Sequence, residues 1–125
     1  MQKLMFESSW NKALSNKDRK VIEDAFLKTA ILNSNSIQFT PLWQAFNHKD
    51  ELLVTMLIHN FTSELVSFND IQLRYLENNK MIAEHLFHLP TLVIQPSYSM
   101  PWTFIFPTSS TKQEATFKNV QMVIY

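Results

Sequence analysis

The sequence contains neither glycine nor cysteine among its 125 residues. At average usage, a chain of this length would hold about nine glycines. Their absence excludes phosphate-cradling loops, dinucleotide-binding fingerprints, nucleophile elbows of the usual kind and standard calcium loops. The absence of cysteine excludes disulfides, thiolate metal sites and cysteine nucleophiles. These absences remove many enzyme classes, but on their own they do not indicate what the protein does.

An excess of one charge and a long apolar run are also missing. Eleven basic residues balance eleven acidic ones, so the formal net charge is zero. Such a chain has no global field that would attract phosphate backbones or anionic lipids, and we expect no nucleic-acid partner. The apolar start ends at Glu7, too early for a signal peptide, and no later apolar run is long enough to span a bilayer. We therefore expect a cytoplasmic protein without a transmembrane segment.

What is present is typical of a folded protein. Hydrophobic residues make up 46% of the chain and charged residues 18%, which favours a globular domain over a disordered tail. The length fits one hydrophobic core, and no repeat, low-complexity tract or linker divides the chain. We predict a single domain over residues 1–125, with a helix at about 16–32 and a β-sandwich at about 35–125.

The helix is predicted from its cap and its period. Ser15 can cap free amide groups at the start, and Ile22 and Phe26 fall on one apolar face. Glu23 lies on the polar face, as expected for an amphipathic helix that covers a core. The preceding residues 1–14 fit either a short helix or an added strand.

Beyond the helix, apolar residues recur with a period of two between polar turns, which predicts strands. The expected strands cover residues 36–46, 51–59, 71–75, 81–88, 91–95, 102–106 and 117–125. Pro41 implies an edge, a bulge or a crossing between sheets in the first of them. Asn78 and Asn79 can form a tight hairpin turn without glycine. About seven strands at this spacing favour an antiparallel β-sandwich of immunoglobulin-like type.

Histidines are the first candidates for a chemical site. His85 and His88 are three residues apart, which in a strand places their side chains on opposite faces, so we expect no metal. A small hydrolase or carbohydrate-binding protein with a site near His59, Asp70 and Ser99 is the alternative, because these residue types form catalytic triads. No elbow motif accompanies them, and we expect no catalytic residues and no cofactor.

The stretch from residue 99 to 107 is the most unusual part of the sequence. Trp102, Phe104 and Phe106 alternate and would form an aromatic row on one face of a strand. A position in the core is favoured for this row, with Phe104 and Phe106 deeper in the strand than Trp102.

A surface for a partner protein is the functional interpretation of the same stretch. Prolines limit strand pairing at its ends, which would leave Met100 and Trp102 as an apolar patch. Trp43 invites the same interpretation beside its own proline. The predicted partner-binding residues are therefore Trp43, Met100, Pro101 and Trp102.

Five segments carry a pattern that extends over nearly the whole chain. They are Leu14–Arg19, Leu42–Asn47, Leu52–Thr55, Ile58–Asn60 and Ser99–Pro107, of which the last is the most specific. With this pattern the sequence resembles the SLAP domain family, which is associated with S-layer assembly and the accessory Sec system of Gram-positive bacteria. It is similar to a single-copy member, whereas the assembly protein that gives the domain its name looks like a two-copy protein.

The resemblance implies a cytoplasmic helper in the export of S-layer proteins, which binds other proteins and catalyses no reaction itself. Its partner would be an accessory secretion ATPase or an exported client, and no catalytic residues come with the family. An edge strand of the predicted sandwich could bind such a client by strand addition. The sequence leaves open the identity of the client, the oligomeric state and any peripheral association with a membrane.

Overall fold

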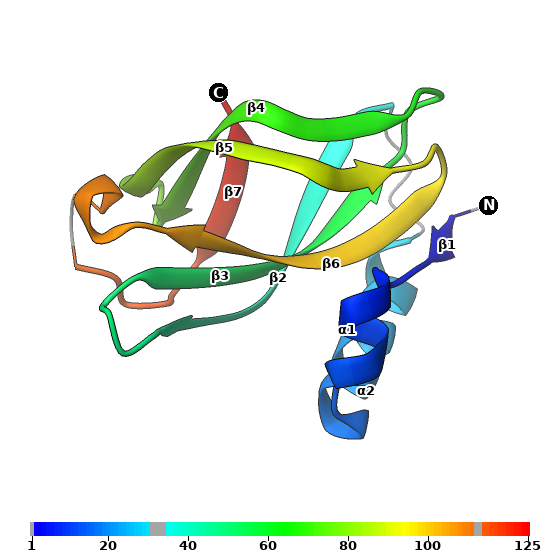
Figure 1. The fold of residues 1–125 in the computed structure, drawn as a ribbon, viewed down its shortest axis with the longest axis horizontal. Helices are drawn as coiled ribbons and strands as arrows, with labels where there is room; N and C mark the ends of the chain where they lie inside the picture. Colours follow the sequence, from blue (N-terminus) through cyan, green and yellow to red (C-terminus); the bar gives the residue numbers. More distant parts are fainter. Residues whose placement is uncertain (1, 31–34, 112–113) are drawn as a thin grey trace.

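The computed structural model describes residues 2–30, 35–111 and 114–125, and most of them lie in β-strands (Figure 1). The strands are β1 (Lys3–Leu4), β2 (Ile37–Phe46), β3 (Leu52–Asn60), β4 (Val66–Glu77), β5 (Lys80–Ile94), β6 (Tyr98–Phe106) and β7 (Val120–Ile124). The helices are α1 (Ser8–Ala13) and α2 (Asn16–Thr29), and a 3-10 turn, η1 (Thr108–Ser110), follows β6. Both helices lie together below the strands in Figure 1.

The strands form two sheets that pack face to face. One sheet has the order β1-β6-β3-β2 and the other has the order β5-β4-β7. Among the described residues, every strand pairing is antiparallel except that of the two-residue β1, which runs parallel to β6. The predicted antiparallel β-sandwich with an N-terminal amphipathic helix is confirmed, and its immunoglobulin-like type stays a prediction.

The core between the sheets is rich in aromatic rings. Phe104 is 1% exposed, and its ring centroid lies 5.9 Å from that of Phe68 and 5.3 Å from that of Phe87. Phe106 is fully buried, 5.1 Å from the Phe87 ring. The predicted core position of Phe104 and Phe106 is confirmed, whereas Trp102 is only partly buried against this core.

β3 is the central strand of its sheet and is buried on both faces. Its core-facing side chains are those of Leu52, Val54, Met56 and Ile58, all without exposed surface. Leu57 and His59 point to the opposite face and are equally buried. The helix α2 packs against β2 and β3, which provides cover on that outer face. β3 is therefore covered on both sides.

The helix α2 begins where the sequence predicts and ends earlier. Ser15 Oγ accepts a hydrogen bond from the Asp18 amide at 3.1 Å, so the predicted cap is confirmed. Ile22 is fully buried and Glu23 is exposed, as expected for the two faces. The helix ends at Thr29, and residues 31 and 32 of the predicted helix lie outside the described residues.

The first fourteen residues contain both alternatives that the sequence allowed. The strand β1 pairs with the start of β6, and the short helix α1 follows it.

Between residues 81 and 95 the structure differs from the expectation, since β5 is one continuous strand rather than two. Pro90 did not end the strand because it lies where the pairing with β4 is irregular, and its missing N–H costs no ladder hydrogen bond there.

Tight turns are made here by residues other than glycine. The described residues with positive φ are Asp50, Asp70, Asn78, Asn79, Ser97, Phe117 and Asn119. Asparagine and aspartate dominate this set because their short polar side chains tolerate the left-handed region best. The hairpin between β4 and β5 uses Asn78 and Asn79 at φ 52° and 65°, which confirms the predicted turn.

Candidate functional site

The four predicted partner-binding residues do not form one surface. The strand register places Trp43 and Pro101 on the outer face of the four-stranded sheet, the face on which α2 packs. Met100 and Trp102 alternate with Pro101 and therefore point to the opposite face, toward the core. Since a strand presents successive side chains to opposite faces, neighbours in sequence cannot share one sheet face here.

Met100 is only 3% exposed and belongs to the core cluster. It is therefore not part of an exposed apolar patch, which corrects the surface position that the sequence suggested for it. Trp102 lines a hollow of about 410 Å³ between β5 and β6, together with Phe87 and His85. Pro101 is buried as well, which corrects its predicted surface position too. Partner binding by Trp43 and Trp102 stays a prediction, and it would involve two separate faces of the sheet.

Two residues of the alternative catalytic site are in contact. Ser99 Oγ lies 2.6 Å from His59 Nδ1, and both side chains are fully buried. On the other side of the ring, Thr29 Oγ1 of α2 and Thr40 Oγ1 of β2 each lie 3.0 Å from His59 Nε2. The ring also stacks on Phe61 with centroids 5.1 Å apart. His59 of β3 thus links α2 to β2 and β6 through its hydrogen bonds.

The directions of these hydrogen bonds fit one tautomer. Thr29 Oγ1 donates to the Ala25 carbonyl at 2.7 Å, so it accepts from the Nε2–H of His59. Nδ1 then accepts from the hydroxyl of Ser99, whose oxygen accepts from Gln2 Nε2 at 3.1 Å. Burial lowers the pKa of His59 from 6.5 to about 4, because a charged imidazolium loses its hydration. His59 is therefore a neutral, structural hydrogen-bonding group.

Asp70 lies elsewhere, in β4 of the other sheet. Its Oδ1 is 3.0 Å from His88 Nδ1, and these two side chains are 67% and 65% exposed. The residues His59, Asp70 and Ser99 therefore do not come together as a triad. Within the described ranges, no group of three or more His, Cys, Asp or Glu side chains is arranged to hold a metal ion.

The edges of the two sheets differ in how they are protected against pairing with another chain. Natural sheets protect edge strands with charges, prolines, bulges or covering segments. β5 carries Lys80, Glu84 and Pro90, and Thr111 forms a bridge to its free side. β1 covers only the start of β6, Pro101 follows, and residues 102–106 contain no charged side chain. Of these two edges, that of β5 is therefore the poorer template for strand addition.

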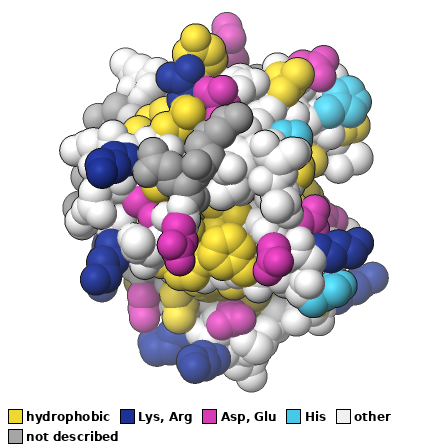
Figure 2. All heavy atoms as spheres, turned by 90° about the vertical axis from the view of Figure 1, so that its left-hand side faces the viewer, with side chains coloured by type: hydrophobic (Ala, Val, Ile, Leu, Met, Phe, Trp, Pro, Cys, Tyr) yellow, Lys and Arg dark blue, Asp and Glu magenta, His cyan; other side chains and the backbone are white. Residues whose placement is uncertain are grey.

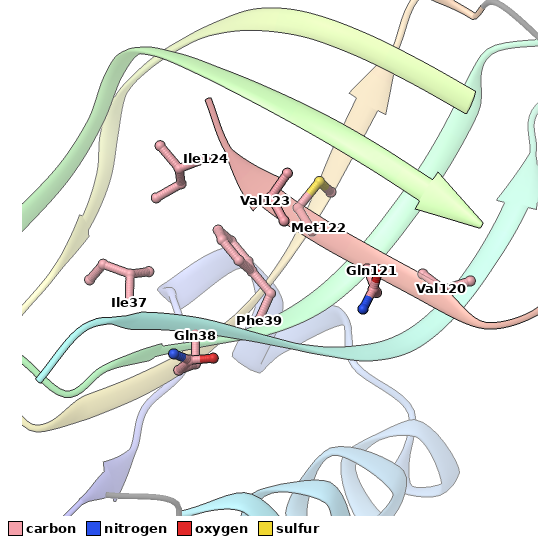
Figure 3. A pocket seen from close by; sticks show the side chains of 8 residues that line it. All are labelled: Ile37, Gln38, Phe39, Val120, Gln121, Met122, Val123 and Ile124. Carbon is pink, nitrogen blue, oxygen red and sulfur yellow. The ribbon is translucent and has the colours of Figure 1, made fainter. Parts of the chain in front are cut away.

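β7 and the first half of β2 lack such protection. Neither strand contains a charged residue, and β7 contains no proline. In β2, Pro41 and the bulge that follows it interrupt regular pairing, which leaves residues 37–40 as the unprotected part. Pairing of the described strands leaves β2 and β7 at the edges of their sheets, and both lie on the same side of the sandwich (Figure 3).

An apolar groove of about 460 Å³ lies between these two edges, and we call it the β2–β7 groove. Six apolar residues and two glutamines line it, namely Ile37, Phe39, Val120, Met122, Val123, Ile124, Gln38 and Gln121. Figure 3 shows the side chains of Phe39 and Ile124 pointing into the space between the two strands. None of the eight residues around the groove is charged.

The backbone groups of β7 at this groove follow from its pairing with β4. The amide of Tyr125 donates to the Gln72 carbonyl at 2.9 Å, so the odd-numbered residues of β7 direct their hydrogen bonds to β4. In an antiparallel pair the alternate residues direct their N–H and C=O groups the other way. Those residues are Val120, Met122 and Ile124, whose side chains also line the groove.

β2 follows the same rule on its side of the groove. Its pairing with β3 includes a bond from the Phe61 amide to the Ser36 carbonyl at 3.3 Å. The even-numbered residues before the bulge therefore bond to β3, and the backbone groups of Ile37 and Phe39 face outward. Both edges thus combine unpaired backbone groups with apolar side chains.

A second apolar surface lies at the end of the sandwich that carries the turn between β2 and β3. Phe46 and Phe117 are 45% and 38% exposed there, with ring centroids 5.7 Å apart. Figure 2 shows this end of the molecule, where acidic and basic side chains are interspersed around the apolar surface. Neither sign of charge dominates this face, in keeping with the neutral net charge of the chain.

The fold and the groove together define a β-sandwich with an N-terminal pair of helices and two unprotected strand edges. A family model, the SLAP domain, matches residues 4–124, which is nearly the whole chain. The chain therefore belongs to the SLAP domain family, and this membership supports an S-layer-associated role in general terms. No curated protein and no solved structure matches the chain. Of the described helices, none has the length and apolar character needed to cross a membrane.

Sequence reasoning did not single out the residues of the β2–β7 groove. One signal was available, because neither residues 37–46 nor residues 120–124 contain a charge. The sequence did not show, however, that these two strands lie at sheet edges on the same side of the molecule. That information depends on the pairing order, which is set by contacts between distant segments.

Proposed function

We propose that this chain is a non-catalytic protein-binding module that assists the accessory Sec-dependent export or assembly of S-layer proteins. Membership of the SLAP domain family supports the association with S-layers. The observation that carries the binding activity is the presence of two unprotected strand edges, β2 and β7, on either side of an apolar groove. The proposed place of action is the cytoplasm, before the client is exported.

The proposed partner is an unfolded client. A strand edge binds main-chain N–H and C=O groups, and an unfolded polypeptide offers these groups along its whole length. A folded ATPase would need a matching free edge or a larger complementary surface. The groove therefore favours the exported client over the accessory secretion ATPase as the direct partner.

Burial of the histidine network supports a binding role rather than catalysis. His59 and Ser99 have no exposed surface, and both ring nitrogens of His59 already have partners. A general base must come within hydrogen-bond reach of a substrate proton. A substrate would have to displace α2 or the strands around the ring to reach His59.

Binding to an S-layer precursor from the same organism tests this proposal. The full chain is immobilised and offered the precursor diluted from denaturant, the folded precursor, and an unfolded cytoplasmic protein as a control. We expect retention of the unfolded precursor, with weaker retention of the control and none of the folded form. Failure to retain the unfolded precursor would contradict the proposal. Retention of the purified ATPase in its place would assign the partner role to the ATPase.

A further inference from the structure

We infer that the β2–β7 groove takes an extended, uncharged segment of a client polypeptide, which adds to the free edge of β7 as one further strand. The inference rests on the proposed function, because it names the chemistry of the segment that the proposed site recognises. Three features of the described residues carry it: the direction of the backbone groups, the shape of the apolar lining and the absence of charge in that lining.

The backbone favours β7 over β2 as the strand that receives the segment. β7 directs the N–H and C=O groups of Val120, Met122 and Ile124 toward the groove. In β2 only Ile37 and Phe39 do so before Pro41 and the bulge interrupt the edge. A strand of five residues spans about 17 Å, so the matching segment has about five or six residues.

The lining favours a segment with alternating apolar side chains. An added strand would point every second side chain toward the core, into the space that Figure 3 shows between Phe39 and Ile124. Ile124 is 44% exposed although its position in the register places it on the inner face, opposite the buried Leu73. An apolar side chain placed there would cover Ile124 and the partly buried Phe39, and burial of such surface is favourable.

The absence of charge favours a neutral segment. None of the residues that line the groove is charged, and neither β2 nor β7 contains an ionisable side chain. A lysine or glutamate carried into this space would lose hydration without gaining an ion-pair partner from the lining. The groove therefore matches an uncharged strand and discriminates against a charged one.

A capped, fluorescently labelled hexapeptide of alternating threonine and valine is a direct probe, with binding to the full chain followed by fluorescence anisotropy. We expect saturable binding, and we expect a valine-to-lysine change in the peptide to weaken it by about tenfold or more. Methylation of alternate peptide nitrogens along one side should abolish binding, because it removes the donors that pair with β7. No saturable binding at millimolar peptide, or equal binding of the lysine peptide, would overturn the inference.

A matched pair of variants tests the location. Ile124 and Ile105 are the same residue type and similarly exposed, at 44% and 48%, but Ile105 lies in β6 and does not line the groove. We expect Ile124→Glu to weaken binding of the neutral peptide by about tenfold or more and Ile105→Glu to change it by less than about twofold. Both variants should remain folded by circular dichroism, since each change is at an exposed position.

A charge exchange completes the test. Ile124→Glu should bind the lysine peptide more tightly than the unmodified chain does, because the two opposite charges then meet in the groove. Equal effects of the two glutamate variants, or no recovery with the lysine peptide, would place the binding elsewhere. If Ile124→Glu still retains the unfolded S-layer precursor fully, the proposed function stands and this inference fails. If the unmodified chain binds the peptide but not the precursor, the proposed function fails.

Discussion

His59 belongs to β3, and its neutral ring connects α2 to β2 and β6 through hydrogen bonds. The folded state holds its pKa near 4 because burial disfavours the charged form, whereas the ordinary value is 6.5. Between these values the unfolded chain binds a proton that the folded chain does not, so stability falls as the pH is lowered. We expect full stability above about pH 6.5 and a loss of about 3 kcal/mol by pH 4, measured by urea denaturation across this range.

Two histidine variants provide the control for this pH dependence. His59→Gln should be less stable near neutral pH, but its stability should change less between pH 6.5 and 4. His48 is exposed and lies in the turn between β2 and β3, so His48→Gln should retain the dependence of the unmodified chain. A pH dependence that survives in His59→Gln would show that another group causes it.

Glu77 is the second buried polar residue with a clear structural role. It is 3% exposed, and its carboxylate accepts hydrogen bonds from the Tyr75 hydroxyl at 2.6 Å and the amides of Thr116 and Phe117 at 2.7 and 2.8 Å. Burial alone would raise the pKa of Glu77, but these hydrogen bonds outweigh it and lower the pKa. The carboxylate thus holds the segment before β7, in which Phe117 has a positive φ of 65°.

Replacement of this carboxylate should destabilise the fold. Glu77→Gln exchanges one acceptor oxygen for a donor that faces amide donors, so we expect a loss of about 2–3 kcal/mol. Thr116→Val removes only the longer hydroxyl contact of 3.2 Å and should cost about 1 kcal/mol or less. Chemical denaturation of the two variants measures this difference, and similar losses would contradict the role assigned to the carboxylate.

At the scale of elements, the packing of α2 on the sheet depends on one buried side chain. Ile22 is fully buried, whereas its neighbour Glu23 is exposed. Ile22→Ala should cost about 2–4 kcal/mol through lost packing, and Glu23→Gln should stay within about 0.5 kcal/mol. Thermal or urea unfolding of both variants tests the assignment of the two faces. Equal losses would mean that the packing of α2 on the sheet contributes little.

The aromatic row of β6 should show a gradient along the strand. Phe104 is 1% exposed and packs among three other aromatic rings, whereas Trp102 is only partly buried. We expect Phe104→Ala to cost about 3–5 kcal/mol and Trp102→Ala about half as much. Urea denaturation monitored by circular dichroism gives both values. A larger loss for Trp102→Ala would show that the hollow between β5 and β6 is part of the core.

At the scale of the whole molecule, local patterns in the sequence predicted the elements and their faces. The capping residue Ser15, the paired asparagines of the hairpin turn and the alternation in β3 each act within a few residues, and the structure confirms all three. The predicted break between residues 88 and 91 is wrong because β5 continues through a bulge of its own there: Leu89 pairs with Phe68 and Val93 with Ser67, which leaves Pro90 outside the regular pairing. The bounds of this strand therefore depend on its pairing with β4, which local sequence patterns do not show.

The candidate site was harder to predict because it depends on the order of strands in the sheets. Trp43 and Trp102 attract attention as large side chains, but strand alternation places them on opposite faces. The groove consists of ordinary apolar residues such as Phe39 and Ile124, which become informative only at adjacent free edges. The alternative hypothesis placed His59 and Ser99 near each other, and their side chains are in contact. Asp70, which it placed with them, belongs to the other sheet.

Amide hydrogen exchange of the full chain with and without the unfolded S-layer precursor tests the central claim, that the edge of β7 is where the client binds. The N–H groups of Met122 and Ile124 point away from β4 and should exchange rapidly in the unbound chain. We predict that the precursor slows their exchange strongly and leaves the free side of β5 unchanged. Protection confined to β5, β6 or α2, with β7 unaffected, would contradict this account.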